Sequence, residues 1–258
     1  MEKNTTNQFE ELVSIITPMH NSARYISDTI ESVISQTYRN WEMIIIDDFS
    51  TDSSRDIVKK YADRDHRIIL IPLETKSQNG VVGVRNEGIK IARGRFISFL
   101  DSDDLWDPKK LLLQIEFMLT NKIAFSYANY RVFDENKCSV VNEFYAPKKV
   151  NYKDICKGNT IGCLVATYDA SLIGKIYNID APKREDFATW LHILKIVTYA
   201  YNVGETLATY RLRKNSVSSK KRKMIKYQWR VYRKIERISF IKSCYYLLIT
   251  IINKALKY

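Results

Sequence analysis

"FISFLDSDDLWDPKKL" (residues 96–111) runs from a short apolar segment straight into three carboxylates within four positions. The apolar part has the length and composition of a buried strand. Asp101, Asp103 and Asp104 follow at once, and like charges this close repel one another. In a tight turn, Asp101 and Asp103 can face one divalent cation, because Mg²⁺ and Mn²⁺ prefer carboxylate and phosphate oxygens. The alternative is that Asp104 caps the next turn and the other two acids are solvated in a loop.

Strand and helix patterns alternate through the residues before this stretch. The expected strands cover residues 12–18, 41–47, 67–72 and 95–100, and the expected helices cover residues 22–36, with Ser22 as N-cap, 50–63 and 79–94. Continuous apolar strands separated by helices are typical of a parallel sheet covered on both faces. The sequence therefore predicts an α/β fold with a mostly parallel sheet.

Polar side chains follow three of these expected strands. Asn21 comes after the first strand, Asp47 and Asp48 end the second, and the Asp101–Asp104 run follows the fourth. In open α/β sheets ligands bind beyond the carboxyl ends of the strands, so we expect a ligand site at this edge. The chain contains no GxGxxG and no GxxxxGK[ST] pattern, so neither a dinucleotide site of the usual kind nor a P-loop is expected.

The second half of the chain is less regular. Residues 122–133 and 200–213 have strand character, and residues 184–197 (REDFATWLHILKIV) have apolar side chains at helical spacing. Asp186 lies at the start of that helix. Its residue type is compatible with a catalytic carboxylate, and equally with a first-turn acid that the helix dipole favours.

The positive charge of the chain is concentrated at one end. The net charge is +12, and residues 211–258 hold fifteen Lys and Arg with a single acid, Glu236, which leaves the rest of the chain at −2. A basic tail of this kind suggests a polyanionic partner surface.

Residues 222–237 (RKMIKYQWRVYRKIER) place their cations within roughly a third of a helical wheel, opposite an apolar face with Trp and Tyr. That pattern suits a helix lying in an anionic membrane surface, and the apolar residues 240–252 could continue the contact although they are too few to span a bilayer. Two alternatives are packing of the apolar face on the rest of the chain and a homodimer formed through the C-terminal helices. No nucleic-acid module accompanies the charge, so we expect no nucleic-acid partner.

The four cysteines show no metal-binding spacing, and the first residues lack the basic-then-apolar pattern of a signal peptide. A reduced, cytoplasmic protein is expected.

Four ordered motifs resemble glycosyltransferase family 2. They are VSIITPMHN (residues 13–21), IIIDDFSTDSS (44–54), GVRNEGIKIARGRFISFLDSDDLWDPKKL (83–111) and REDFATWL (184–191). The resemblance covers about residues 12–213 and implies the Rossmann-like GT-A fold of nucleotide-diphospho-sugar transferases. It divides the chain into a catalytic domain, residues 1–213, and a basic helical tail, residues 214–258. Within the domain, residues 12–104 would be the nucleotide-binding half and residues 105–213 the acceptor half.

The resemblance also implies roles for particular residues. Asp186 matches the general base, and Asp101 and Asp103 match the DxD motif, whose last Asp meets a Mn²⁺ or Mg²⁺ ion bridging the donor diphosphate. Asp48 matches the acid that accepts the ring N–H of uracil. The residues expected to contact the nucleotide sugar are Pro18, His20, Asn21, Asp47, Asp48, Arg85, Asn86, Asp101, Ser102, Glu185, Arg211 and Arg213.

Arg213 marks a departure from the family pattern. Many relatives have His there as a metal or diphosphate ligand, whereas arginine stays protonated and cannot ligate a metal. Arg213 could pair with the diphosphate instead.

Taken together, the motifs predict an inverting hexosyltransferase. The resemblance implies a UDP-sugar donor and an undecaprenyl-diphosphate-linked sugar acceptor, in the synthesis of bacterial O-antigen or capsule, at the inner face of the cell membrane. The alternatives are transfer to a soluble or protein acceptor, a nucleotidyltransferase that handles sugar nucleotides, and a non-catalytic membrane-binding protein on a transferase fold.

Overall fold

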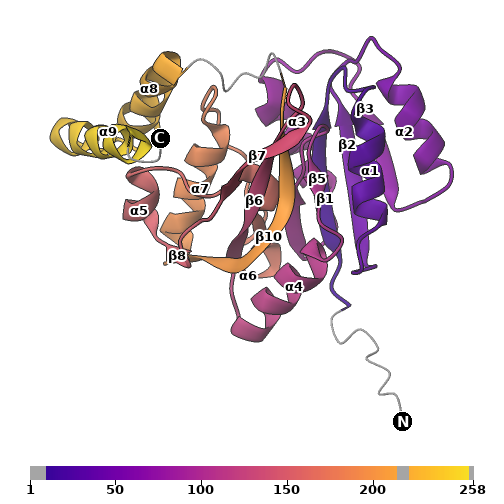
Figure 1. Ribbon diagram of the computed structural model, residues 1–258, viewed down its shortest axis with the longest axis horizontal. Helices are drawn as coiled ribbons and strands as arrows, with labels where there is room; N and C mark the ends of the chain where they lie inside the picture. The colour runs from indigo at the N-terminus through magenta and orange to yellow at the C-terminus, as the bar shows by residue number, and fades with distance from the viewer. Residues whose placement is uncertain (1–9, 214–220, 256–258) are drawn as a thin grey trace.

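The computed structural model describes residues 10–213 and 221–255, and ten strands of that part of the chain form one sheet in the order β3-β2-β1-β4-β9-β6-β10-β5, with β7 and β8 at its margins (Figure 1). The first four strands are β1 (Val13–Met19), β2 (Trp41–Asp47), β3 (Ile68–Pro72) and β4 (Phe96–Phe99). They are parallel to one another, as the alternating pattern predicts. Every residue of β2 and β4 is buried, which explains why these strands are mostly apolar; the buried acids Glu42 and Asp47 of β2 are paired with Arg93 and Arg55.

Helices connect these parallel strands. They are α1 (Ile26–Ile34), α2 (Ser54–Ala62) and α3 (Gly80–Ile91). α3 packs on β1 and β2, and α2 packs on β3. Because all four strands run in one direction, their carboxyl ends lie along a single edge of the sheet, at the position predicted for the ligand site.

The second half completes a mixed sheet. Its elements are β5 (Leu105–Trp106), α4 (Lys110–Asn121), β6 (Phe125–Asp134), β7 (Ser139–Phe144), β8 (Lys149–Val150), α5 (Tyr152–Cys156), the 3₁₀ turn η1 (Cys163–Val165), β9 (Thr167–Asp169), α6 (Ala170–Ile173), α7 (Glu185–Ile196) and β10 (Ala200–Leu212). β9 lies antiparallel between β4 and β6, and β10 is parallel to β6. The predicted α/β fold with a mostly parallel sheet is confirmed, and β9 is the short strand that joins its two halves.

Ser22 does not have the predicted role of N-cap. The helix begins later, at Ile26, after Tyr25, and no side chain caps it. The Ser22 carbonyl instead accepts the backbone N–H groups of Tyr25 and Ile26, and its hydroxyl lies 2.7 Å from that of Ser102. A tertiary contact with the loop after β4 therefore replaces the local cap that the sequence suggested.

The C-terminal segment forms α8 (Lys221–Arg230), a π-helical turn η3 (Val231–Ile235) and α9 (Phe240–Ala255), which lie beside α5 and α7 at one end of the molecule (Figure 1). Val231 and Tyr232 are buried in the core, and the Tyr232 hydroxyl donates to the carbonyl of Cys156 at 2.5 Å. The Glu236 carboxylate accepts from the Tyr152 hydroxyl at 2.6 Å and pairs with Lys195. Part of the apolar face predicted for residues 222–237 thus packs on the body through Val231 and Tyr232, whereas Ile225 on the same face is exposed.

Residues 214–220, where the predicted boundary between domain and tail falls, lie outside the described residues. Among the helices that the structure describes, none is long and apolar enough to cross a membrane.

Candidate active site

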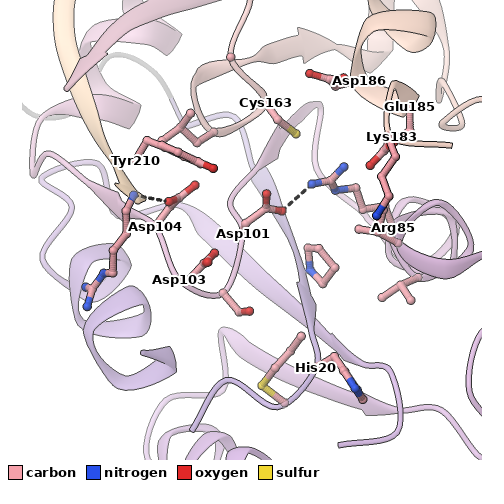
Figure 2. A pocket seen from close by; sticks show the side chains of 18 of the residues that line it. His20, Arg85, Asp101, Asp103, Asp104, Cys163, Lys183, Glu185, Asp186 and Tyr210 are labelled. Atoms are coloured by element: carbon pink, nitrogen blue, oxygen red, sulfur yellow. Dashed lines mark hydrogen bonds and ion pairs between the residues drawn. The ribbon is translucent and has the colours of Figure 1, made fainter. Parts of the chain in front are cut away.

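A cavity of about 880 Å³ lies at the carboxyl ends of the parallel strands, between them and the start of α7 (Figure 2). Most of the predicted site residues line it. They are Pro18, His20, Asp48, Arg85, Asp101, Ser102, Asp103, Glu185, Asp186, Arg211 and Arg213. Segments far apart in the chain therefore meet at the carboxyl ends of the parallel strands, where a ligand site was predicted.

Asp101 is held by an arginine from the neighbouring helix. Arg85, buried on α3, reaches its carboxylate at 2.5 Å. Burial alone would lower the pKa of Arg85, but the adjacent Asp101 charge outweighs it and raises the pKa, so this guanidinium stays charged.

Two further carboxylates share the loop after β4. Asp103 pairs with Arg213 at 2.7 Å, and the buried Asp104 accepts the backbone N–H of Arg211 at 2.9 Å. Burial, and next the charge of Asp101, raises the pKa of Asp103; burial, followed by the charges of Asp103 and Asp101, raises that of Asp104 well above its ordinary value. Burial and crowding thus disfavour the charged form of these two carboxyls, and the charge of Arg213 opposes that effect at both.

The residues present fit a divalent cation that also binds substrate. Within the described residues no three His, Cys, Asp or Glu side chains converge on one point. Asp101 and Asp103 supply hard carboxylate oxygens at the cavity wall, and Mg²⁺ is commonly bound by one or two carboxylates together with substrate phosphates. The donor set thus suits a metal that is completed by a diphosphate rather than a permanent structural ion.

Asp186 faces the cavity from the first turn of α7, across from the carboxylate loop (Figure 2). One of its oxygens accepts the backbone N–H of Phe187 at 2.6 Å, and the other accepts the side-chain amide of Asn159 at 3.2 Å. Burial raises the pKa of Asp186 although the Phe187 N–H opposes it, and burial likewise raises the pKa of Glu185. A cavity carboxylate whose pKa is raised by desolvation is a candidate general base.

Asp48 and His20 form the opposite wall. Asp48 Oδ1 accepts the backbone N–H of Ser77 at 2.6 Å. His20 Nδ1 lies 2.8 Å from the carbonyl oxygen of Asp48. Because a carbonyl only accepts, Nδ1 carries the proton, and this bond fixes the orientation of the ring beside Pro18.

Three residues expected at the site lie outside the cavity wall. The Asn21 side chain accepts the backbone N–H of Thr51, and Asp47 is fully buried and paired with Arg55. Asn86 exchanges hydrogen bonds with the backbone of Asn178. In this structure these groups hold neighbouring loops together.

Asp104, part of the predicted carboxylate run, and Met19, at the end of β1, line the cavity as well. Further lining residues were not expected from the sequence. They are Val81, Val84, Tyr130, Gly162, Cys163, Leu164, Lys183, Arg184, Tyr210 and Met224. Arg184 is the first residue of the motif at 184–191 and Lys183 directly precedes it, so their closeness to the Glu185–Asp186 pair was a usable signal. Tyr130, Cys163 and Met224 come from elements that only the tertiary structure brings to the cavity.

Comparison with protein families identifies the class. Residues 14–167 match the family model for glycosyl transferase family 2. The chain belongs to this family and is a glycosyltransferase, as the motifs predict.

The similar proteins include several bacterial enzymes. The chain is 43% identical over 221 residues to WfgD of Escherichia coli, with 85% of each chain covered, and 40% identical over 227 residues to WfaP of the same species, with 87% of each covered. Both are named UDP-Glc:alpha-D-GlcNAc-diphosphoundecaprenol beta-1,3-glucosyltransferases. TuaG of Bacillus subtilis, whose name refers to teichuronic acid biosynthesis, is 43% identical over 235 residues, which cover 91% of this chain and 92% of TuaG.

Solved structures share the fold. TarS of S. aureus, in complex with UDP-GlcNAc, superposes with a TM-score of 0.71 at 20% identity, covering 93% of this chain and 70% of that one. The mannosyltransferase PcManGT from Pyrobaculum calidifontis, in complex with GDP-Man and Mn²⁺, gives a TM-score of 0.67 at 15% identity, covering 90% and 66%. The expected GT-A fold is confirmed.

Proposed function

We propose that this enzyme transfers a hexose, with UDP-glucose as the first candidate donor, to a hydroxyl of N-acetylglucosamine linked through a diphosphate to undecaprenol. The product would belong to a bacterial surface polysaccharide. The observation that carries this proposal is the identity of 43% and 40% with two enzymes of that named activity, each over more than four-fifths of both chains.

The chemistry assigned to the cavity is a single displacement. Asp186 accepts the proton of the acceptor hydroxyl as that oxygen forms a bond to the anomeric carbon. The bond between that carbon and the diphosphate breaks, and UDP leaves with the bonding electrons. Attack from the face opposite the leaving group turns an α-linked donor into a β-linked product.

The carboxylate loop is assigned to the leaving group. Asp101 and Asp103 would hold Mn²⁺ or Mg²⁺, which supplies charge neutralisation at the departing diphosphate. Arg213, paired with Asp103 here, lies where its guanidinium could turn to the diphosphate.

The nucleotide is assigned to the wall formed by Asp48 and His20. Asp48 has one carboxylate oxygen on Ser77, so its second oxygen is available to a ring N–H. Uracil carries such a donor and cytosine does not, and the His20 ring offers a stacking surface beside it.

We also assign an anionic membrane surface as a partner, at the inner face of the cell membrane, contacted through α9. Seven large or sulfur-containing side chains on α9 are exposed: Phe240, Ile241, Cys244, Tyr245, Leu248, Ile251 and Ile252. At about 100° per residue they fall within roughly 140° of one helical face. The same C-terminal segment has exposed cations at Lys226, Arg230, Lys234, Arg237 and Lys242, of which Lys242 lies on α9 itself. An exposed apolar face in a segment rich in exposed cations suits a helix lying in an anionic interface, where a lipid-linked acceptor resides.

Turnover with purified substrates tests the proposal. The enzyme with Mn²⁺ or Mg²⁺ would be given UDP-glucose, UDP-galactose, UDP-N-acetylglucosamine and GDP-mannose in turn, with a synthetic N-acetylglucosaminyl diphosphate lipid as acceptor. We expect one UDP-hexose to be consumed and NMR of the product to show a new β-linkage. Preference for GDP-mannose, or an α-linked product, would contradict the proposal.

A further inference from the structure

The cations that line the cavity fall into two groups. Arg85 pairs with Asp101, Arg213 pairs with Asp103, and Arg211 pairs with Asp28 at 3.1 Å. Lys183 and Arg184 also line the cavity, but neither forms an ion pair with a carboxylate in the part of the chain that the structure describes. These two cations are therefore available to an anion that enters the cavity.

Arg184 is partly buried and incompletely bonded. Its Nε is buried and has no hydrogen-bond partner among residues 10–213 and 221–255, and Nη2 donates to the side-chain carbonyl of Gln228 at 3.2 Å. Burial lowers the pKa of Arg184, although the nearby Asp186 charge opposes this. A desolvated guanidinium with an unused donor is stabilised when an anion completes its bonds.

The position of these cations points to the acceptor rather than the donor. They directly precede Glu185 and the proposed base Asp186, at the N-terminus of α7, where the helix dipole also favours negative charge. The group that loses its proton to Asp186 belongs to the acceptor. The loop that carries Asp101, Asp103 and Asp104 lies across the cavity from Asp186, and Arg85 lies between Asp101 and Glu185, where it is already paired with Asp101 (Figure 2).

Arg184 is also connected to the C-terminal helices. Gln228, whose side-chain oxygen accepts from Arg184, lies on α8. Its side-chain nitrogen donates to the Tyr232 hydroxyl at 2.6 Å and to the Thr250 hydroxyl of α9 at 3.1 Å. Met224 of α8 lines the same cavity. A chain that leaves the cavity past Arg184 thus meets α8 and then α9, which carries the exposed apolar face.

We infer that Lys183 and Arg184 form a second anion site, distinct from that of the donor, which binds the diphosphate of a lipid-linked acceptor and directs its hydrocarbon chain along α8 and α9. This inference rests on the proposed function. It predicts that the enzyme recognises the linkage of the acceptor as well as its sugar, because the two cations contact the diphosphate.

Paired acceptors test the site. One is N-acetylglucosaminyl diphosphate on a short prenyl chain, and the other has an ether in place of the diphosphate. Full-length wild type, Arg184→Gln, Arg184→Lys and Lys183→Gln would be compared by calorimetric titration in the presence of UDP and by turnover. Lys153→Gln removes an exposed cation on α5 outside the cavity and is the matched control.

We expect Arg184→Gln to weaken binding of the diphosphate acceptor on the order of tenfold or more, the scale of one charge-assisted hydrogen bond. Lys183→Gln should act in the same direction, and Arg184→Lys should recover part of the loss. The ether acceptor and UDP should bind all variants alike, and inorganic pyrophosphate should compete with the acceptor less effectively in Arg184→Gln than in wild type. Melting curves separate a folding defect from a binding defect, and Lys183→Gln gives an answer even if Arg184→Gln folds poorly.

The opposite results are equally clear. If UDP affinity falls while acceptor binding is unchanged, the two cations serve the donor and the inference is wrong. The inference also fails if wild type binds both acceptors equally, or if Lys153→Gln matches the cavity variants. Failure of the proposed function looks different, because wild type would then form no product from any UDP-hexose with either acceptor.

Discussion

The Asp186 carboxylate is held in place by two hydrogen bonds, and burial raises its pKa. We predict that Asp186→Asn leaves the affinity for UDP close to that of wild type and lowers kcat by about 10²-fold or more, because the amide keeps the shape but cannot accept the proton. UDP titration and steady-state kinetics measure the two effects. A collapse of UDP affinity would instead place Asp186 in the nucleotide site.

The pH dependence follows from the same carboxylate. A general base works when deprotonated, and burial raises the pKa of Asp186, so kcat/KM should fall on the acid side at a pH above the ordinary aspartate range. Asn159→Ala removes a donor that stabilises the charged form, which raises the pKa further and shifts this limb to higher pH. Asn121→Ala, an exposed amide at the end of α4, should leave the profile unchanged. An acid limb that stays in place in Asn159→Ala would contradict this prediction.

Asp103 can be tested without turnover. We predict that Asp103→Asn weakens Mn²⁺ binding in the presence of UDP, measured by the EPR signal of free Mn²⁺, because the diphosphate-metal complex loses a carboxylate ligand. Asp107→Asn, in the following turn and outside the cavity, is the control. Equal Mn²⁺ affinity in wild type and both variants would remove Asp103 from the metal site.

At the scale of single elements, Gly94 determines how closely the loop after α3 approaches β1. A Cβ there would lie 2.5 Å from the backbone nitrogen of Ser14 and 2.7 Å from the carbonyl of Leu12. We predict that Gly94→Ala lowers the free energy of unfolding by roughly 1–3 kcal/mol, since backbone atoms cannot rotate away. Urea denaturation measures the change.

Gly83→Ala is the matched control for that substitution. Its Cβ would crowd the Ser77 hydroxyl, which is a side chain that can rotate, and alanine is favoured over glycine within a helix. We expect a clearly smaller change in unfolding free energy. Equal destabilisation in both variants would mean that backbone contact at Gly94 is not the cause.

In the molecule as a whole, the C-terminal helices pack against the core with one side and expose the other side. Ile241 and Leu248 on α9 have exposed fractions of 82% and 57%. We predict that Ile241→Glu with Leu248→Glu abolishes co-sedimentation with anionic vesicles and leaves the melting temperature unchanged, because the apolar insertion is lost and no buried contact is broken. Wild-type binding should weaken as salt rises, since counterions screen the cations of this surface.

Val140→Glu with Val141→Glu provides the control for the vesicle experiment. Both valines are exposed on β7, so the pair adds the same charge to another apolar surface. Vesicle binding that survives the α9 substitutions, or that falls equally in the β7 control, would contradict a membrane role for α9.

Much of the fold follows from local pattern. β2 and β4 are fully buried and mostly apolar because both faces of those strands are covered, and their carboxyl ends lie on one edge because the strands are parallel. That is why Asp48 and Asp101, separated by more than fifty positions, could be expected in one site from the sequence alone. Asp186 was recognisable only through its motif, since a first-turn acid is common in helices.

Contacts between distant segments were decided by the tertiary structure alone. Amphipathic spacing indicates that residues 222–237 have an apolar face, but not which surface that face packs against, and Tyr232 proves to be buried beside Cys156. Likewise Asn159 meets Asp186, and Gln228 holds Arg184, through folding of separate elements. Local periodicity was enough to predict the strands and the edge of the sheet where they end, and residue type was enough to predict the carboxylates at that edge. Only the three-dimensional packing decided which groups support the base and which face of the C-terminal helices stays exposed, because those depend on contacts that no local pattern encodes.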